Sequence, residues 1–132
     1  MKFLIDTNIP SELLRPRPNP GVVAWLAAQR ELAISVVSVD ESIFGLTMKG
    51  NTAVLAAYEN FLASHCTILQ MDADVARRAG TLRANLGQKG FVRSQPDMII
   101  AATAQKHDLT LVTRNTRDFQ YCGIALLNPF SD

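Results

Sequence analysis

The chain opens with Met1-Lys2-Phe3-Leu4-Ile5-Asp6-Thr7-Asn8, a short apolar run that ends directly in an acid. Four later runs share its apolar character and its brevity, at residues 33–37, 67–69, 110–112 and 124–127. Short runs of this kind are typical of strands that are buried on both faces of a parallel sheet. The sequence therefore predicts five strands.

Helical patterns lie between these runs. The pair Asn19-Pro20 predicts a helix N-terminus, and Asp72 is placed to cap a second helix. Apolar side chains recur at helical spacing over residues 54–62, and a last helix is expected to begin near Pro96. Strands that alternate with helices predict an α/β fold, in which helices flank a parallel sheet.

The size and charge of the chain limit its function. Its 132 residues, 48% of them hydrophobic, suffice for one domain spanning residues 1–132. A net charge of +1 gives no overall attraction to nucleic acid or to anionic membranes. Cys66 and Cys122 form no CxxC motif, and no apolar run suits a signal peptide or a membrane span. We expect a reduced, soluble, cytoplasmic protein without a membrane contact.

Four acids fall at corresponding ends of these elements. Asp6 and Asp118 follow strand runs, Glu41 lies four residues beyond a third run, in the first turn of a helix expected to start after Ser38, and Asp97 opens the last helix. Ligands of open parallel sheets bind beyond the carboxyl ends of the strands, so these acids are expected to converge. Converging carboxylates repel one another unless a cation lies between them, and oxygen ligands favour Mg²⁺ or Mn²⁺ over zinc. The pattern predicts metal-dependent hydrolysis of RNA or DNA.

Each acid also has a structural explanation. Ser38-Val39-Asp40-Glu41 matches a capping box, in which Glu41 would bond the backbone of Ser38. Asp97 would gain from the dipole of its helix, and Asp6 or Asp118 could form turns. The convergence of all four acids at one end of different elements favours a common site over four separate structural roles.

The basic residues give a second, weaker indication of a nucleic-acid substrate. Arg114 and Arg117 flank Asp118, where phosphates of a bound RNA strand would lie. A larger group is equally consistent with the solvated face of a helix and comprises Arg77, Arg78, Arg83, Lys89 and Arg93.

Four stretches together resemble the signatures of PIN-domain nucleases: Leu4-Ile5-Asp6-Thr7-Asn8, residues 35–41 with Gly45, residues 97–104, and residues 111–119. The chain is most similar to the VapC toxins of bacterial toxin–antitoxin pairs, including their FitB-like branch. The resemblance implies a PIN-like three-layer sandwich with a five-stranded parallel sheet, and endonucleolytic cleavage of RNA. It also implies a homodimer that is silenced by a cognate VapB-like antitoxin.

The same resemblance implies roles for individual residues. Asp6 and Asp97 correspond to the principal ligands of Mg²⁺ or Mn²⁺, Glu41 to a ligand or to the group that orients the attacking water, and Asp118 to a ligand that often acts through water. Neighbouring polar positions that would orient the carboxylates or a phosphate are Thr7, Ser38, Thr113 and Asn115.

Three residues depart from the family pattern. Ser42 replaces a commonly apolar residue, Asp40 adds an acid beside Glu41, and Asp108 stands where glycine often ends the helix. Asp108 must therefore adopt a left-handed conformation or end the helix differently.

Two other functions fit parts of the pattern. A receiver-like domain would bind Mg²⁺ and accept a phosphoryl group. It needs paired acids early in the chain and a lysine after a late strand, and neither is evident here. A catalytically silent PIN-like scaffold would serve interaction alone, yet this chain retains all four acids.

Overall fold

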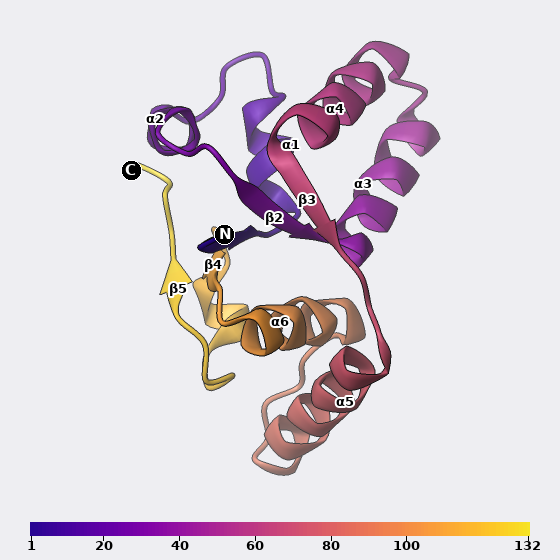
Figure 1. Ribbon diagram of the computed structural model, residues 1–132, viewed down its shortest axis with the longest axis vertical. Helices are drawn as coiled ribbons and strands as arrows, with labels where there is room; N and C mark the ends of the chain where they lie inside the picture. Colours follow the sequence, from indigo (N-terminus) through magenta and orange to yellow (C-terminus); the bar gives the residue numbers. More distant parts are fainter.

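The computed structural model describes all residues 1–132 and contains a single five-stranded sheet (Figure 1). The strands are β1 (Phe3–Ile5), β2 (Leu32–Ser35), β3 (Cys66–Leu69), β4 (Thr110–Val112) and β5 (Leu126–Leu127). They are all parallel, in the order β3-β2-β1-β4-β5. The predicted parallel sheet is confirmed. Its order differs from the 2-1-3-4-5 order of receiver domains, which excludes the receiver-like alternative.

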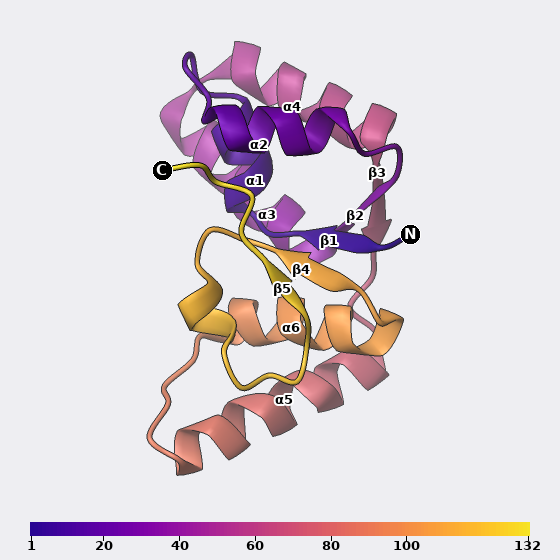
Figure 2. The same ribbon diagram turned by 90° about the vertical axis from the view of Figure 1, so that its left-hand side faces the viewer.

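Helices cover both faces of the sheet. On one side lie α1 (Asn8–Leu13), α2 (Pro20–Ala27), α3 (Val36–Lys49) and α4 (Thr52–His65), and on the other α5 (Ala73–Gln88) and α6 (Gln95–His107) (Figures 1 and 2). Successive strand residues point to opposite faces: Leu4 belongs to the core under α5 and α6, whereas Ile5 packs with Tyr58 and Phe61 of α4. The α/β sandwich with three layers is confirmed.

Two helices begin where their capping residues predict. The Asn19 side chain accepts a hydrogen bond from Gly21 N at 3.0 Å, and the Asp72 side chain accepts one from Val75 N at 2.9 Å. Asp108 ends α6 in the left-handed conformation, with φ of 53°. The side chain of an aspartate tolerates this conformation better than most residues do, which accounts for the absence of glycine here.

The start of α3 contradicts the sequence prediction. The helix begins at Val36 rather than after Ser38, because Ser35 Oγ accepts a hydrogen bond from Val37 N at 3.1 Å and caps it. The expected strand over residues 33–37 therefore ends two residues early, and the predicted capping box between Ser38 and Glu41 does not form. The β-branched valines favoured a strand, but the free backbone donors follow the Ser35 cap.

A smaller deviation occurs in the last strand. It covers only Leu126–Leu127 of the expected residues 124–127. None of the helices is both long and apolar enough to cross a membrane.

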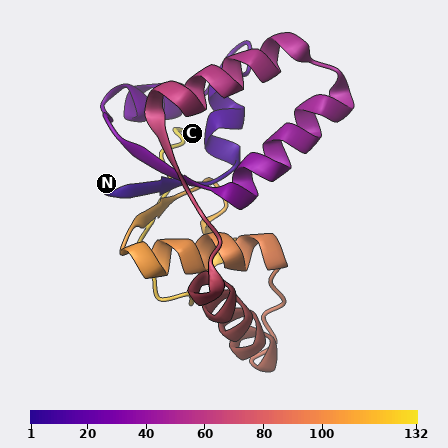
Figure 3. The same cartoon turned by 45° about the vertical axis from the view of Figure 1, so that its right-hand side comes forward.

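The C-terminal segment returns to the start of α2 (Figure 2). Asn19 Nδ2 donates to the Ser131 carbonyl at 2.9 Å, and Asn19 Oδ1 accepts from Ser131 N at 3.0 Å. Gly21 permits this approach, because a Cβ atom there would lie 2.4 Å from the Pro129 carbonyl oxygen. The α3–α4 hairpin, by contrast, projects outward from the edge of the sheet (Figure 3).

Candidate active site

Asp6 lies at the carboxyl end of the central strand β1 and is only 5% exposed. Three donors hold its carboxylate: Thr113 Oγ1 at 2.7 Å, Thr7 N at 2.8 Å and Asn8 Nδ2 at 3.2 Å. Thr113 follows β4, the neighbouring strand, and is itself fully buried. The orientation of Asp6 is therefore set by groups at the ends of two adjacent strands.

Glu41 approaches the same edge from the second turn of α3. The Thr7 hydroxyl lies 3.0 Å from Glu41 Oε1 and 3.0 Å from Ser38 Oγ. A hydroxyl carries one proton and a carboxylate only accepts, so Thr7 donates to Glu41 and the buried Ser38 hydroxyl supplies the proton of the second bond. These contacts link α3 to the end of β1.

Asp97 lies in the first turn of α6 and is half-buried. The side chain of Ser94 caps this helix and accepts a hydrogen bond from Asp97 N at 3.2 Å. The free backbone donors of the helix N-terminus place partial positive charge beside the carboxylate. Asp97 therefore enters the site from a rigid element on the opposite face of the sheet from Glu41.

Asp118 is exposed on a single 3₁₀ turn, Thr116–Phe119, that follows β4. Its backbone N–H donates to the Asn115 carbonyl at 3.0 Å, and Asn115 N donates in turn to Thr113 Oγ1 at 3.0 Å. The buried Phe119 anchors the turn in the core. The Asn115 backbone thus connects the Asp118 turn to Thr113, and the Thr113 hydroxyl in turn donates to Asp6.

The charges of neighbouring acids act on Asp6 and on Asp97. Burial raises the pKa of Asp6, its hydrogen bonds from Thr113 and Thr7 lower it in part, and the charges of Glu41 and Asp118 raise it further. Burial also raises the pKa of Asp97; Ser94 opposes this, and the charges of Asp6 and Asp118 add to it. The carboxylates are close enough to repel one another, yet no three Asp, Glu, His or Cys side chains form a metal-coordinating group.

The donor set fits a hard divalent cation. The four carboxylates offer only oxygen, which suits Mg²⁺ and Mn²⁺ and not the sulfur- and nitrogen-preferring metals. The Cys122 thiol is buried and packs against Met98. Burial raises the pKa of this thiol, and the charge of Asp97 helps to raise it, so it offers no thiolate. A cation would also relieve the repulsion that raises the pKa of Asp6 and Asp97.

The basic side chains are arranged unevenly around this edge. The Arg114 guanidinium lies 4.9 Å from the centroid of the Phe130 ring, turned toward the C-terminal segment, whereas Arg117 is exposed beside Asp118. Arg78 pairs with Asp74 at 3.1 Å and has a structural role. Arg93 departs from the expected helix face, because its positive charge lowers the pKa of Asp97 and its Nη2 donates to the Arg117 carbonyl at 3.5 Å.

Two residues of this edge were missed as site residues by sequence reasoning. Asn8 bridges the ends of β1 and β4, because its Nδ2 donates to Asp6 and its Oδ1 accepts from Arg114 N at 3.2 Å. Ser94 is the cap of α6, and the spacing Ser94-x-x-Asp97 is a helix-start signature that could have identified it. Asn8 stands in the first signature stretch, but two of its partners, Thr113 and Arg114, are more than a hundred residues away, so the sequence did not show its bridging role.

Comparison with known proteins places the chain in a family. Residues 3–123 match the family model described as PIN domain. The chain is 34% identical to Toxin FitB of Neisseria gonorrhoeae, covering 98% of this chain and 99% of that protein. It is 32% identical to VapC ribonuclease Y4jK of Sinorhizobium fredii, covering 97% of both.

Solved structures show the same fold. The structure titled FitAB bound to an IR36 DNA fragment matches with a TM-score of 0.85 and 32% identity, over 98% of this chain and 96% of that chain. A toxin–antitoxin complex from Klebsiella pneumoniae matches with a TM-score of 0.76 and 29% identity, over 99% of this chain and all of that chain.

Proposed function

The chain belongs to the PIN-domain family, and on this premise we propose that it is the ribonuclease toxin of a toxin–antitoxin pair, with Asp6, Glu41, Asp97 and Asp118 as its metal-binding and catalytic acids. One observation carries the assignment of residues. Asp6 and Asp97 stand on different elements at the carboxyl edge of the sheet, and each has a pKa raised by burial and by the neighbouring acids. Such a site favours a divalent cation.

Asp6 and Asp97 are the principal ligands in this proposal, because they are the more buried acids and stand on rigid elements. Thr113 and Asn8 fix the orientation of Asp6. Mg²⁺ or Mn²⁺ held there would neutralise charge on the scissile phosphate and activate the attacking water.

Glu41 has a different role, because its carboxylate is exposed and its hydrogen-bond partner is the Thr7 hydroxyl. Thr7 fixes one carboxylate oxygen, while the other is free to orient a water molecule and accept its proton. Asp118, exposed on its short turn, is the fourth acid at the carboxyl edge of the sheet. Arg117 lies beside it and would contact phosphates of the RNA strand.

The proposed partners are a cognate antitoxin and a second copy of the chain. The antitoxin follows from the likeness to a solved toxin–antitoxin complex. The second copy is supported by α3, where Phe44 is 65% exposed and Met48 is 74% exposed beside Asp40 and Ile43. Two exposed apolar side chains one helical turn apart form a surface suited to association.

The test is cleavage of RNA by the purified chain, with and without Mg²⁺ or Mn²⁺. We expect cleavage only with the metal, and its loss in the variants Asp6→Asn and Asp97→Asn. Asp40→Asn is the matched control, because this exposed acid faces the Phe44 surface and should retain activity. Cleavage that persists in excess chelator, or in either site variant, contradicts the assignment. Metal binding without any cleavage would instead support the silent scaffold.

A further inference from the structure

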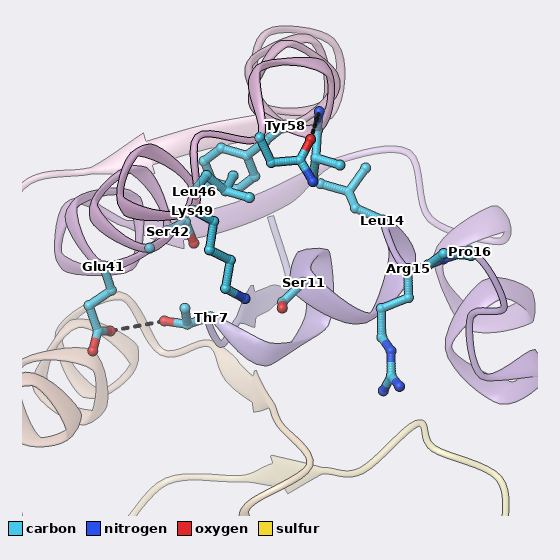
Figure 4. Close-up of a pocket in the computed structure, with 13 residues that line it drawn as sticks. Thr7, Ser11, Leu14, Arg15, Pro16, Glu41, Ser42, Leu46, Lys49 and Tyr58 are labelled. Carbon is cyan, nitrogen blue, oxygen red and sulfur yellow. Dashed lines mark hydrogen bonds between the residues drawn. The ribbon is translucent and has the colours of Figure 1, made fainter.

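A hollow of about 540 Å³ lies beside the acids, between α1, α3 and α4 (Figure 4). Thr7 and Glu41 form one end of it, so the hollow is continuous with the candidate active site. Its volume lies within the range of about 300–1,000 Å³ that is typical of small-molecule sites. The four catalytic acids leave most of this space unused.

An unpaired polar group lies in its wall. Tyr58 is 1% exposed, and no hydrogen bond of good geometry reaches its hydroxyl, although Ser42 lies close to it. Burial raises the pKa of Tyr58, and the weak contact with the Ser42 side chain lowers it in part, so the phenol keeps its proton and can donate. Buried polar groups nearly always have a partner, because an unpaired one destabilises the fold. An unpaired hydroxyl in the wall of a hollow therefore points to a ligand.

The charge of the hollow favours an anionic polymer. Lys49 makes no hydrogen bond and no ion pair, and it projects from α3 toward the α1 side, where Ser11 and Thr7 lie (Figure 4). Arg15 lines the far end but is paired with Glu12 at 3.2 Å, so Lys49 is the free cation; Glu41 is the only acid among the lining residues. A cation beside polar hydroxyls, next to a site for phosphodiester chemistry, matches a sugar–phosphate backbone.

We propose that this hollow receives the base of a nucleotide next to the scissile phosphate, with Tyr58 and Ser42 bonding its edge and Lys49 contacting the adjoining phosphate. The proposal rests on the proposed ribonuclease function and adds the source of its base selectivity. A nucleobase edge carries the acceptors that a buried hydroxyl donor requires, and single-stranded RNA presents its bases unstacked.

A peptide is the competing occupant. Most of the lining surface is apolar, but only four of the 13 lining residues are hydrophobic, whereas a helix docked in a groove buries a continuous apolar face. Lining hydroxyls and a free lysine would be left without partners beneath such a face. The Tyr58 hydroxyl and the free Lys49 therefore favour the nucleotide.

The test uses short RNAs that differ only in the bases flanking the cleaved bond, and matching RNAs with an abasic ribose at those positions. The wild-type protein should prefer one base at one flanking position. Tyr58→Phe should reduce this preference roughly three- to tenfold, the equivalent of one neutral hydrogen bond. The variant should cleave the abasic RNA within about twofold of the wild-type rate, because no base is present to bond. Lys49→Gln should weaken binding of every RNA by a similar factor.

Tyr121→Phe is the matched control, because Tyr121 is 67% exposed and lies outside the hollow. Unchanged base preference in Tyr58→Phe, or an equal loss on abasic RNA, would overturn the proposal. So would a normal cleavage pattern combined with weaker binding of the co-expressed cognate antitoxin, which would assign the hollow to a protein. Failure of the wild-type protein to cleave any of these RNAs would refute the proposed function instead.

Discussion

The variant Thr113→Val tests whether Thr113 holds Asp6 in its ionised form. The substitution keeps the branched shape of the side chain and removes a fully buried hydroxyl that donates to Asp6 Oδ2 at 2.7 Å. A hydrogen bond to a charged group contributes about 1.5–3 kcal/mol. We therefore expect the free energy of unfolding to fall by about 2–3 kcal/mol near neutral pH in chelator. The Asn115 N–H also loses its hydrogen-bond partner, but Asn115 is exposed, so a water molecule can replace that partner.

The pH dependence of this loss has a definite sign. Burial raises the folded-state pKa of Asp6 above its ordinary value of 3.8, so ionisation of Asp6 disfavours the folded state. That loss of stability develops as the pH rises from 3.8 through the folded-state pKa. Removing the Thr113 donor raises the folded-state pKa further. The destabilisation by Thr113→Val should therefore be largest near neutral pH and decline as the pH falls through the folded-state pKa.

The assay is urea unfolding of both proteins in chelator at several pH values. Thr103→Val is the matched control, because Thr103 is equally buried but donates to a neutral carbonyl, Ile99 O, at 2.8 Å. We expect it to lose about 1 kcal/mol at every pH. Equal losses in the two variants across the whole pH range would refute the role given to Thr113.

Three further variants address the metal, the C-terminal segment and the dimer. Adding Mg²⁺ at ten times its Kd should stabilise the metal-free wild-type protein by about 1.4 kcal/mol in thermal unfolding, and an equal response in Asp97→Asn would contradict Asp97 as a ligand. Gly21→Ala should destabilise by about 1–3 kcal/mol and expose the segment around Pro129 to proteases, because its Cβ collides with the Pro129 carbonyl. Phe44→Glu should convert a dimer to a monomer in light scattering; an unchanged mass would place the interface away from α3.

The centre of the sheet could be predicted because its three middle strands, β2, β1 and β4, are buried on both faces. Leu4, Ile5, Leu111 and Val112 are fully buried, so their sequence shows a continuous apolar run, and an acid or a polar residue marks where the strand ends. The starts of α2 and α5 could be predicted as well, because Asn19 and Asp72 are capping residues directly before each helix. Strand runs and helix caps are both recognised from residues that are neighbours in sequence.

Contacts between distant segments could not be predicted in the same way. Asn8 bonds Thr113 and Arg114, and nothing in the sequence near Asn8 indicates that β4 lies beside β1. The position of Arg93 is similar, since the sequence places it among basic residues of a helix face and only the fold brings its charge to Asp97. The positions of Asn8 and Arg93 in the site depend on contacts between segments that are distant in sequence, and such contacts leave no local pattern.

The start of α3 shows how a one-turn error changes the interpretation of a catalytic acid. Ser35 and Ser38 are both plausible caps, and only the Ser38 choice gives Glu41 a structural partner. In the structure Ser35 caps the helix, so Glu41 has no such role and its carboxylate bonds Thr7, at the end of β1. Ser38, released from capping, is buried against Thr7. The capping box was the strongest structural explanation for any of the four acids, and its absence leaves the interaction with Thr7 as the reason for Glu41 to stand at this edge.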